Sequence, residues 1–179
     1  SVSHAGFILV GFEAATHTSK SDATLGLSSI SSYLFIYSLL VIGTFAVISM
    51  VVSDEGMPLT TLDGLGKSNP VLALAMTALL LAQAGVPVTA GFIAKFGVIR
   101  AAVAVPNYPL AVLAMVTSVI AAYLYLRIII SLWLKAPVPR VQFKVHAATG
   151  LVVAISVTFV FAVGLFPAIW LEIGKQLGK

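Results

Sequence analysis

The chain has 179 residues, of which 60% are hydrophobic and only 9% are charged, and its mean hydropathy is +1.10. This composition excludes an ordinary soluble domain and indicates an integral membrane protein. The formal net charge of +4 comes from lysines and arginines scattered among loops and helix ends, so it does not indicate a nucleic-acid partner.

The first half of the chain contains two apolar runs of different length. Residues 5–15 form about half a membrane span with no basic segment before it, so we expect the chain to begin inside a helix of a longer polypeptide. A polar loop over 16–24 precedes an uncharged run that predicts a helix over 27–53. Residues 54–69 are rich in Gly, Pro and charge, which is typical of a surface loop.

The longest apolar stretch covers residues 70–105 and is too long for one straight helix across about 30 Å of hydrocarbon. The segment Gly85–Gly91 interrupts it, which predicts a discontinuous helix. Two further helices are expected over 109–134 and 146–170, joined by a short basic loop. The predicted fold is an all-α integral membrane bundle of about five transmembrane helices in one domain over residues 1–179, with the first helix truncated.

Lys95 lies one turn beyond this break. It is ten residues before Val105, or about 15 Å along a helix. An ammonium near the bilayer centre costs at least about 2.5–3.5 kcal/mol, which makes such a lysine a functional candidate. A lysine can accept and release a proton, whereas an arginine stays protonated, so a proton relay is the chemistry expected. The alternative is a helix-end lysine that extends to the headgroups.

The residues of the break are the second candidate feature. Gly85, Pro87 and Gly91 weaken or remove backbone hydrogen bonds, and the freed groups must face protein or a water-filled cavity. Discontinuous helices of this kind recur at ion sites in transporters. Thr89 is placed to satisfy a freed carbonyl or to bind a water. A simple proline kink without any ion is the alternative.

His4 is the third candidate, because histidine titrates near neutrality and can pass protons. A neutral histidine that forms hydrogen bonds between helices is the alternative. Several hydroxyl side chains on later helices either line a wet path or form bonds between helices: Ser118, Tyr123, Tyr125, Ser156 and Thr158. The chain has no cysteine, no H-E-x-x-H and no glycine-rich nucleotide loop, so the sequence predicts no metal or cofactor site.

Four segments together resemble the antiporter-like membrane subunits of complex I. The run from Ala82 to Phe96, with its core G-x-P-x-T-x-G-F-x-x-K-F, resembles the family's broken, lysine-bearing helix. Residues 1–7 are similar to the family's "SSI-HxG" stretch two helices earlier, and residues 33–45 and 118–127 are similar to the helices on either side of the broken one. The lysine, together with the lack of a histidine in 27–53, favours the subunit N type.

The resemblance covers the whole chain but only the C-terminal part of the longer family bundle. It implies proton translocation coupled to quinone reduction elsewhere in an NADH–quinone oxidoreductase, with Lys95 as the terminal relay lysine and His4 in the central hydrophilic axis. It also implies a hetero-oligomer with other membrane-arm subunits in a bacterial plasma membrane. Flavin and iron–sulfur clusters would belong to partner subunits.

Two other functions stay open on the sequence. Multisubunit cation/proton antiporters and membrane-bound hydrogenases use a similar broken helix, so a subunit of either is one alternative. A purely structural helix bundle is the other.

Overall fold

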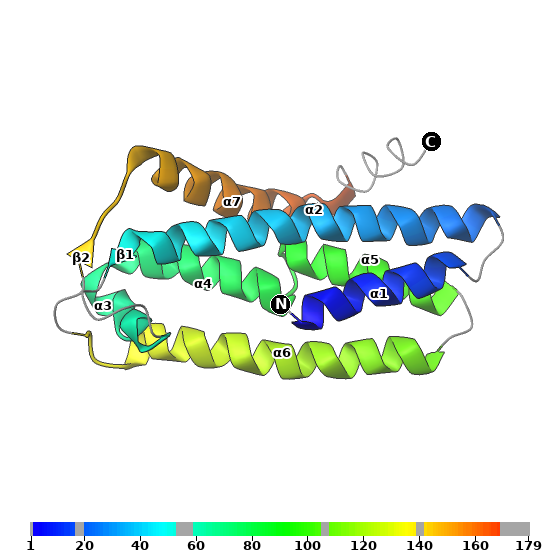
Figure 1. The fold of residues 1–179 in the computed structure, drawn as a ribbon, viewed down its shortest axis with the longest axis horizontal. Helices are drawn as coiled ribbons and strands as arrows, with labels where there is room; N and C mark the ends of the chain where they lie inside the picture. Colours follow the sequence, from blue (N-terminus) through cyan, green and yellow to red (C-terminus); the bar gives the residue numbers. More distant parts are fainter. Residues whose placement is uncertain (1, 17–19, 53–58, 105–107, 139–141, 169–179) are drawn as a thin grey trace.

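The computed structural model describes residues 2–16, 20–52, 59–104, 108–138 and 142–168. It is an elongated helical bundle, which confirms the predicted fold class (Figure 1). Its elements in chain order are α1 (Val2–Thr16), α2 (Lys20–Met50), β1 (Val51–Val52), the 3-10 turn η1 (Leu59–Leu62), α3 (Leu65–Ser68), α4 (Pro70–Ala84), α5 (Ala90–Ala104), α6 (Tyr108–Leu134), β2 (Gln142–Phe143) and α7 (Ala147–Leu165).

Five passes along the bundle correspond to the five predicted helices. α2, from Gly26 onward, α6 and α7 are each long and apolar enough to cross a membrane. α1 is shorter, with 15 residues. α4 and α5 also have 15 residues each and follow one another along the bundle, so together they form the predicted discontinuous helix (Figure 1).

Three boundaries differ from the prediction. α2 begins at Lys20, inside the expected loop, and it ends at Met50 because Val51 and Val52 pair with Phe143 and Gln142 of β2. The expected helix over 146–170 ends at Leu165. Phe166 precedes Pro167, and a residue before proline is pushed out of the helical conformation.

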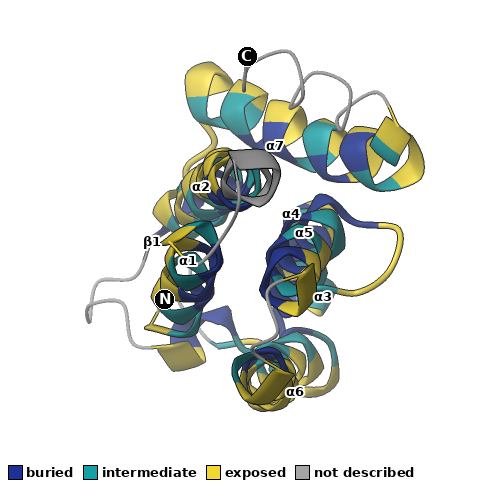
Figure 2. Ribbon diagram, turned by 90° about the vertical axis from the view of Figure 1, so that its right-hand side faces the viewer, coloured by how far each residue is buried: buried dark blue, intermediate teal, exposed yellow. Residues whose placement is uncertain are grey.

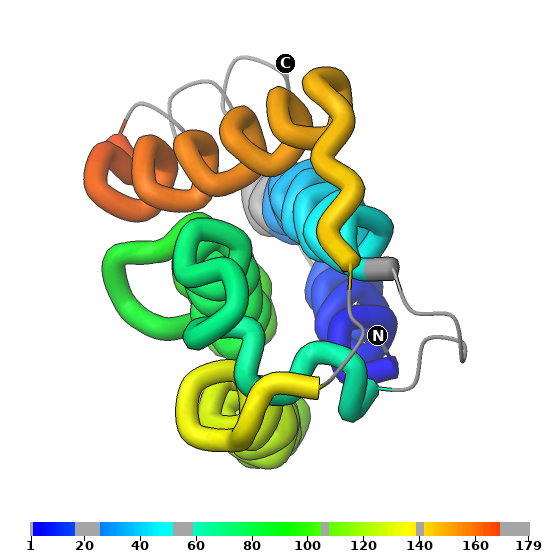
Figure 3. Tube along the Cα trace, turned by 90° about the vertical axis from the view of Figure 1, so that its left-hand side faces the viewer, coloured from blue at the N-terminus to red at the C-terminus, as the bar shows by residue number. Residues whose placement is uncertain are grey.

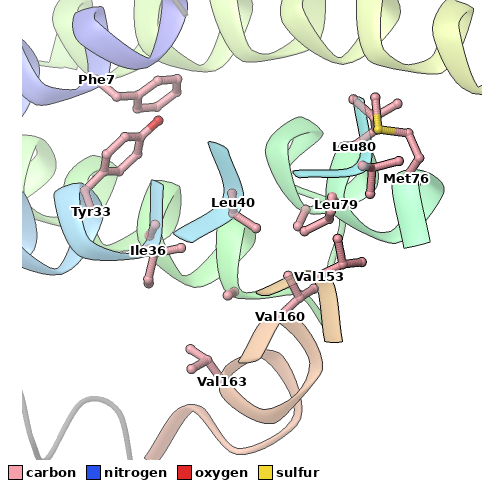
Figure 4. Packing of buried hydrophobic residues seen from close by; sticks show 14 of the residues in the cluster. Phe7, Tyr33, Ile36, Leu40, Met76, Leu79, Leu80, Val153, Val160 and Val163 are labelled. Atoms are coloured by element: carbon pink, nitrogen blue, oxygen red, sulfur yellow. The ribbon is translucent and has the colours of Figure 1, made fainter. Parts of the chain in front are cut away.

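The core lies between the inward faces of all five passes, and α6 contributes one face to it while the rest of that helix is exposed (Figure 2). α7 crosses obliquely over α2, as the view from the other end shows (Figure 3). Near the middle of the bundle the rings of Phe7 and Tyr33 stack, and α4 and α7 contribute aliphatic side chains further along (Figure 4). Apolar surface of this kind faces lipid in a membrane, so close packing, not water exclusion, holds such helices together.

α7 packs closely at two glycines. A Cβ on Gly43 of α2 would lie 2.6 Å from the Cβ of Ser156 on α7. A Cβ on Gly164 of α7 would collide with the carbonyl oxygen of Val88 and lie 2.6 Å from the Cα of Thr89. α7 therefore rests directly on the segment that joins α4 to α5.

We expect Gly164→Ala to destabilise the protein by about 1–3 kcal/mol, because the new methyl group meets backbone atoms that cannot rotate away. Gly150→Ala on the same helix is the matched control, since its Cβ would have only Val145 Cγ1 nearby, at 3.9 Å. Thermal unfolding of the full-length protein in detergent compares the two. Equal midpoints would contradict the close contact at Gly164.

Candidate functional site at the helix break

The break begins with a glycine cap on α4. Gly85 has a left-handed backbone conformation, with φ 85° and ψ 37°. Its N–H donates to the Ala82 carbonyl at 3.0 Å, and the N–H of Val86 donates to the Leu81 carbonyl at 3.1 Å. This pair of bonds is the Schellman arrangement, which ends a helix while satisfying two of its last carbonyls.

The linker between α4 and α5 satisfies a further carbonyl and carries strain. The Thr89 hydroxyl donates to the Val86 carbonyl at 2.7 Å. Pro87 lies in this linker and is exposed. Val88 has a φ of 73°, a conformation that a β-branched residue rarely adopts. The chain therefore makes the turn with a locally unfavourable backbone, held by the surrounding contacts.

Lys95 of α5 is buried at this break, with a relative exposure of 6%. Its Nζ donates to the Ala84 carbonyl oxygen at 2.9 Å and to Ser118 Oγ of α6 at 3.1 Å. The ring centroid of Phe7 on α1 lies 5.4 Å from the same nitrogen. The ammonium thus contacts three other helices.

These partners stabilise a cation without carrying a full negative charge. The Ala84 carbonyl belongs to the last turn of α4, where the helix dipole is negative and where carbonyls lack partners inside the helix. An aromatic face within about 6 Å adds a cation–π attraction. Among the described residues, the groups recorded in contact with this nitrogen are a carbonyl, a hydroxyl and a ring, with no carboxylate. Within the described part of the chain, the Lys95 nitrogen therefore contacts neutral groups.

Two glycines make room for this arrangement. A Cβ on Gly85 would lie 2.9 Å from Lys95 Cδ and 3.2 Å from its Nζ, so the lysine stem passes where a side chain would otherwise stand. A Cβ on Gly91 would collide with the Ala82 carbonyl oxygen. The start of α5 can therefore lie against the end of α4 only without a side chain at Gly91.

His4 on α1 is also buried, with 4% exposure. Its Nδ1 forms a hydrogen bond with the Tyr33 hydroxyl at 2.7 Å, and its Nε2 forms one with the Tyr125 hydroxyl at 3.0 Å. Its ring stacks on Tyr37, with centroids 4.4 Å apart. Both ring nitrogens are engaged, and His4 connects α1 to α2 and α6.

The structure brings the two predicted titratable residues together. His4 and Lys95 line one cavity of about 10 Å³ together with Tyr33, Tyr37, Leu40, Ile36, Gly91 and Ala94. That volume is close to what a single water molecule requires. His4 and Lys95 therefore lie near one another around a small space whose exposed lining is apolar.

The other hydroxyl residues divide between the site and its surroundings. Ser118 contacts Lys95, and Tyr125 contacts His4. Tyr123 is 66% exposed, and Ser156 packs against Gly43. Thr158 is exposed on α7. Sequence reasoning missed the roles of Tyr33 and Tyr37. Their signal is two tyrosines one turn apart in the uncharged, strongly apolar run over residues 27–53.

Comparison with known proteins gives consistent matches. A family described as "NADH:quinone oxidoreductase/Mrp antiporter, TM" matches residues 1–121. NADH-quinone oxidoreductase subunit N 1 of Herpetosiphon aurantiacus is 40% identical over 99% of this chain and 35% of that protein. The subunit N of Trichlorobacter lovleyi is 37% identical over 100% of this chain and 36% of its own length.

A solved structure also has the same fold. A chain of respiratory complex I from Thermus thermophilus with bound aureothin superimposes with a TM-score of 0.74 at 24% identity, over 95% of this chain and 43% of that chain. The present chain spans about a third of the length of the relatives it matches.

We expect Gly85→Ala to destabilise the protein by about 1–2 kcal/mol, because the left-handed backbone conformation that glycine adopts freely is energetically unfavourable for alanine. The added methyl group would also push on the Lys95 stem. Gly97→Ala is the control, since its Cβ would meet Ser29 Oγ at 3.7 Å and the change raises helix propensity. The midpoint of thermal unfolding should be lower for Gly85→Ala than for Gly97→Ala. A Gly85→Ala midpoint equal to that of the unmodified protein would contradict the cap.

Proposed function

Because the chain belongs to the NADH:quinone oxidoreductase/Mrp antiporter transmembrane family, we propose that it forms part of a proton-translocating membrane-arm subunit of a respiratory NADH–quinone oxidoreductase. The names of the relatives, at 35–40% identity, support this parent enzyme. The chain itself contributes no redox group. It serves the enzyme by moving protons while other subunits transfer electrons.

The observation that carries the proposal is the burial of the Lys95 ammonium among neutral partners at a helix break. A buried charge in that position costs free energy, so its presence favours a functional role for the proton that Lys95 holds. The carbonyl, hydroxyl and aromatic contacts favour the ammonium, yet none of them is an anion. Lys95 can therefore release its proton without separating a buried ion pair.

His4 extends the path beyond Lys95. A neutral imidazole donates from one ring nitrogen and accepts at the other, so one of its two tyrosine partners donates to it and the other accepts from it. A proton that arrives at one nitrogen leaves from the other, and the ring then changes its tautomer. His4 and Lys95 line the same small cavity, so the two titratable groups lie close to one another.

The partners follow from the proposed enzyme. We place the chain in a hetero-oligomer with other membrane-arm subunits, in a bacterial plasma membrane and surrounded by lipid. Flavin and iron–sulfur clusters belong to the subunits that oxidise NADH. The residues of this chain offer no thiolate ligand for such a cluster.

A cation/proton antiporter subunit is the second candidate, because the matching family description covers Mrp antiporters as well. The composition of the purified assembly discriminates between them. Flavin and iron–sulfur subunits would support the oxidoreductase. Small membrane subunits alone, with sodium-dependent activity, would support the antiporter.

Lys95→Ala in the intact complex is expected to lower proton-coupled quinone reduction by at least roughly tenfold, because the relay group is lost. Lys95→Arg should not restore it, since an arginine keeps its proton. Lys135→Ala is the control: Lys135 is 56% exposed and its ion pair with Asp63 lies at the protein surface. Proton uptake in proteoliposomes measures the effect, and normal pumping by Lys95→Ala would refute the relay.

His4→Phe should also reduce proton pumping, since phenylalanine keeps the ring's volume but has no titratable nitrogen. His146→Phe is the matched control, because His146 is exposed at the start of α7 and makes no side-chain capping bond. The ratio of protons moved to NADH oxidised is the measurement. If both histidine variants keep the ratio of the unmodified complex, His4 has only a structural role.

A further inference from the structure

The two hydrogen-bond acceptors at Lys95 Nζ differ in what they can do. The Ala84 carbonyl can only accept, so it serves the ammonium and the N–H groups of the neutral amine. The Ser118 hydroxyl can accept and can also donate. Once Lys95 loses a proton, its nitrogen has a lone pair, and of these two partners only Ser118 can donate to it.

Ser118 reaches Lys95 from α6, a helix with few fully buried side chains. The buried residues of α6 are Ala111, Ala114, Ala121 and Leu132. Tyr125 stands seven residues after Ser118, which is two helical turns further on the same face, and it bonds to His4. One face of α6 thus contacts both titratable residues of the site.

We propose that Ser118 is the positioning residue of Lys95, holding its nitrogen at the break in both protonation states. In the charged state an N–H of the ammonium donates to the Ser118 oxygen. Once Lys95 has given up a proton, the serine hydroxyl turns and donates to the new lone pair. Serine keeps its own proton throughout. This inference rests on the proposed relay function of Lys95.

Thr117 provides a built-in comparison on the same helix. Its hydroxyl donates to the Ala114 carbonyl at 2.9 Å, which lies within α6. It is exposed, and the structure records no bond from it to Lys95 or His4. A change at Thr117 removes a hydroxyl from α6 without removing one from the site.

The test compares Ser118→Thr with Ser118→Val in the intact complex. These variants have nearly the same shape, and only threonine keeps the hydroxyl. We expect Ser118→Val to lower the turnover number of proton-coupled quinone reduction by roughly threefold to tenfold, with the KM for quinone unchanged. Ser118→Thr should keep most of the activity. Ser118→Ala, which adds no volume, should behave like the valine variant, and Thr117→Val should behave like the unmodified complex.

A double variant separates this inference from the relay itself. If Ser118 acts through Lys95, Ser118→Val adds no further loss to Lys95→Ala. Additive losses, or equal activity of the threonine and valine variants, would overturn the positioning role while leaving the relay intact. Full pumping by Lys95→Ala would instead overturn the relay and this inference with it.

Discussion

The hydrogen bond from Lys95 Nζ to the Ala84 carbonyl oxygen joins the two halves of the interrupted helix. A helix that stops inside hydrocarbon leaves carbonyls without partners, and a lysine placed there leaves an ammonium without solvent. Each group supplies what the other lacks. The break and the buried cation are therefore one feature, because either alone would be much more costly in the membrane.

Small residues are the condition for this pairing. Gly85 allows the left-handed cap and the passage of the lysine stem, and Gly91 allows α5 to start against the end of α4. Gly164 brings α7 onto the linker from the other side. In a membrane, where apolar burial gives little drive for association, such close backbone contacts determine how the helices sit. The position of the Lys95 nitrogen thus depends on three residues that have no side chain.

The parts of this structure that follow from composition and spacing were predictable. The hydrophobic runs predicted the five passes, and Gly, Pro and Lys within one run predicted the helix break and the buried cation beside it. The partners of each polar group were not predictable. His4 bonds to tyrosines 29 and 121 positions away, and such pairings depend on how the helices rotate and approach each other. The β1–β2 pairing was missed because it joins Val51 and Val52 to residues far along the chain, which a local pattern does not reveal. The early start of α2 lies in a segment whose polarity is typical of a loop.

The left-handed backbone of Val88 has an energetic consequence for the linker. A non-glycine residue in that conformation stores on the order of 1–3 kcal/mol. The electrical work of moving one elementary charge through 100 mV is about 2.3 kcal/mol. The free energy stored at Val88 is therefore of the same order as the work of moving one charge across an energised membrane.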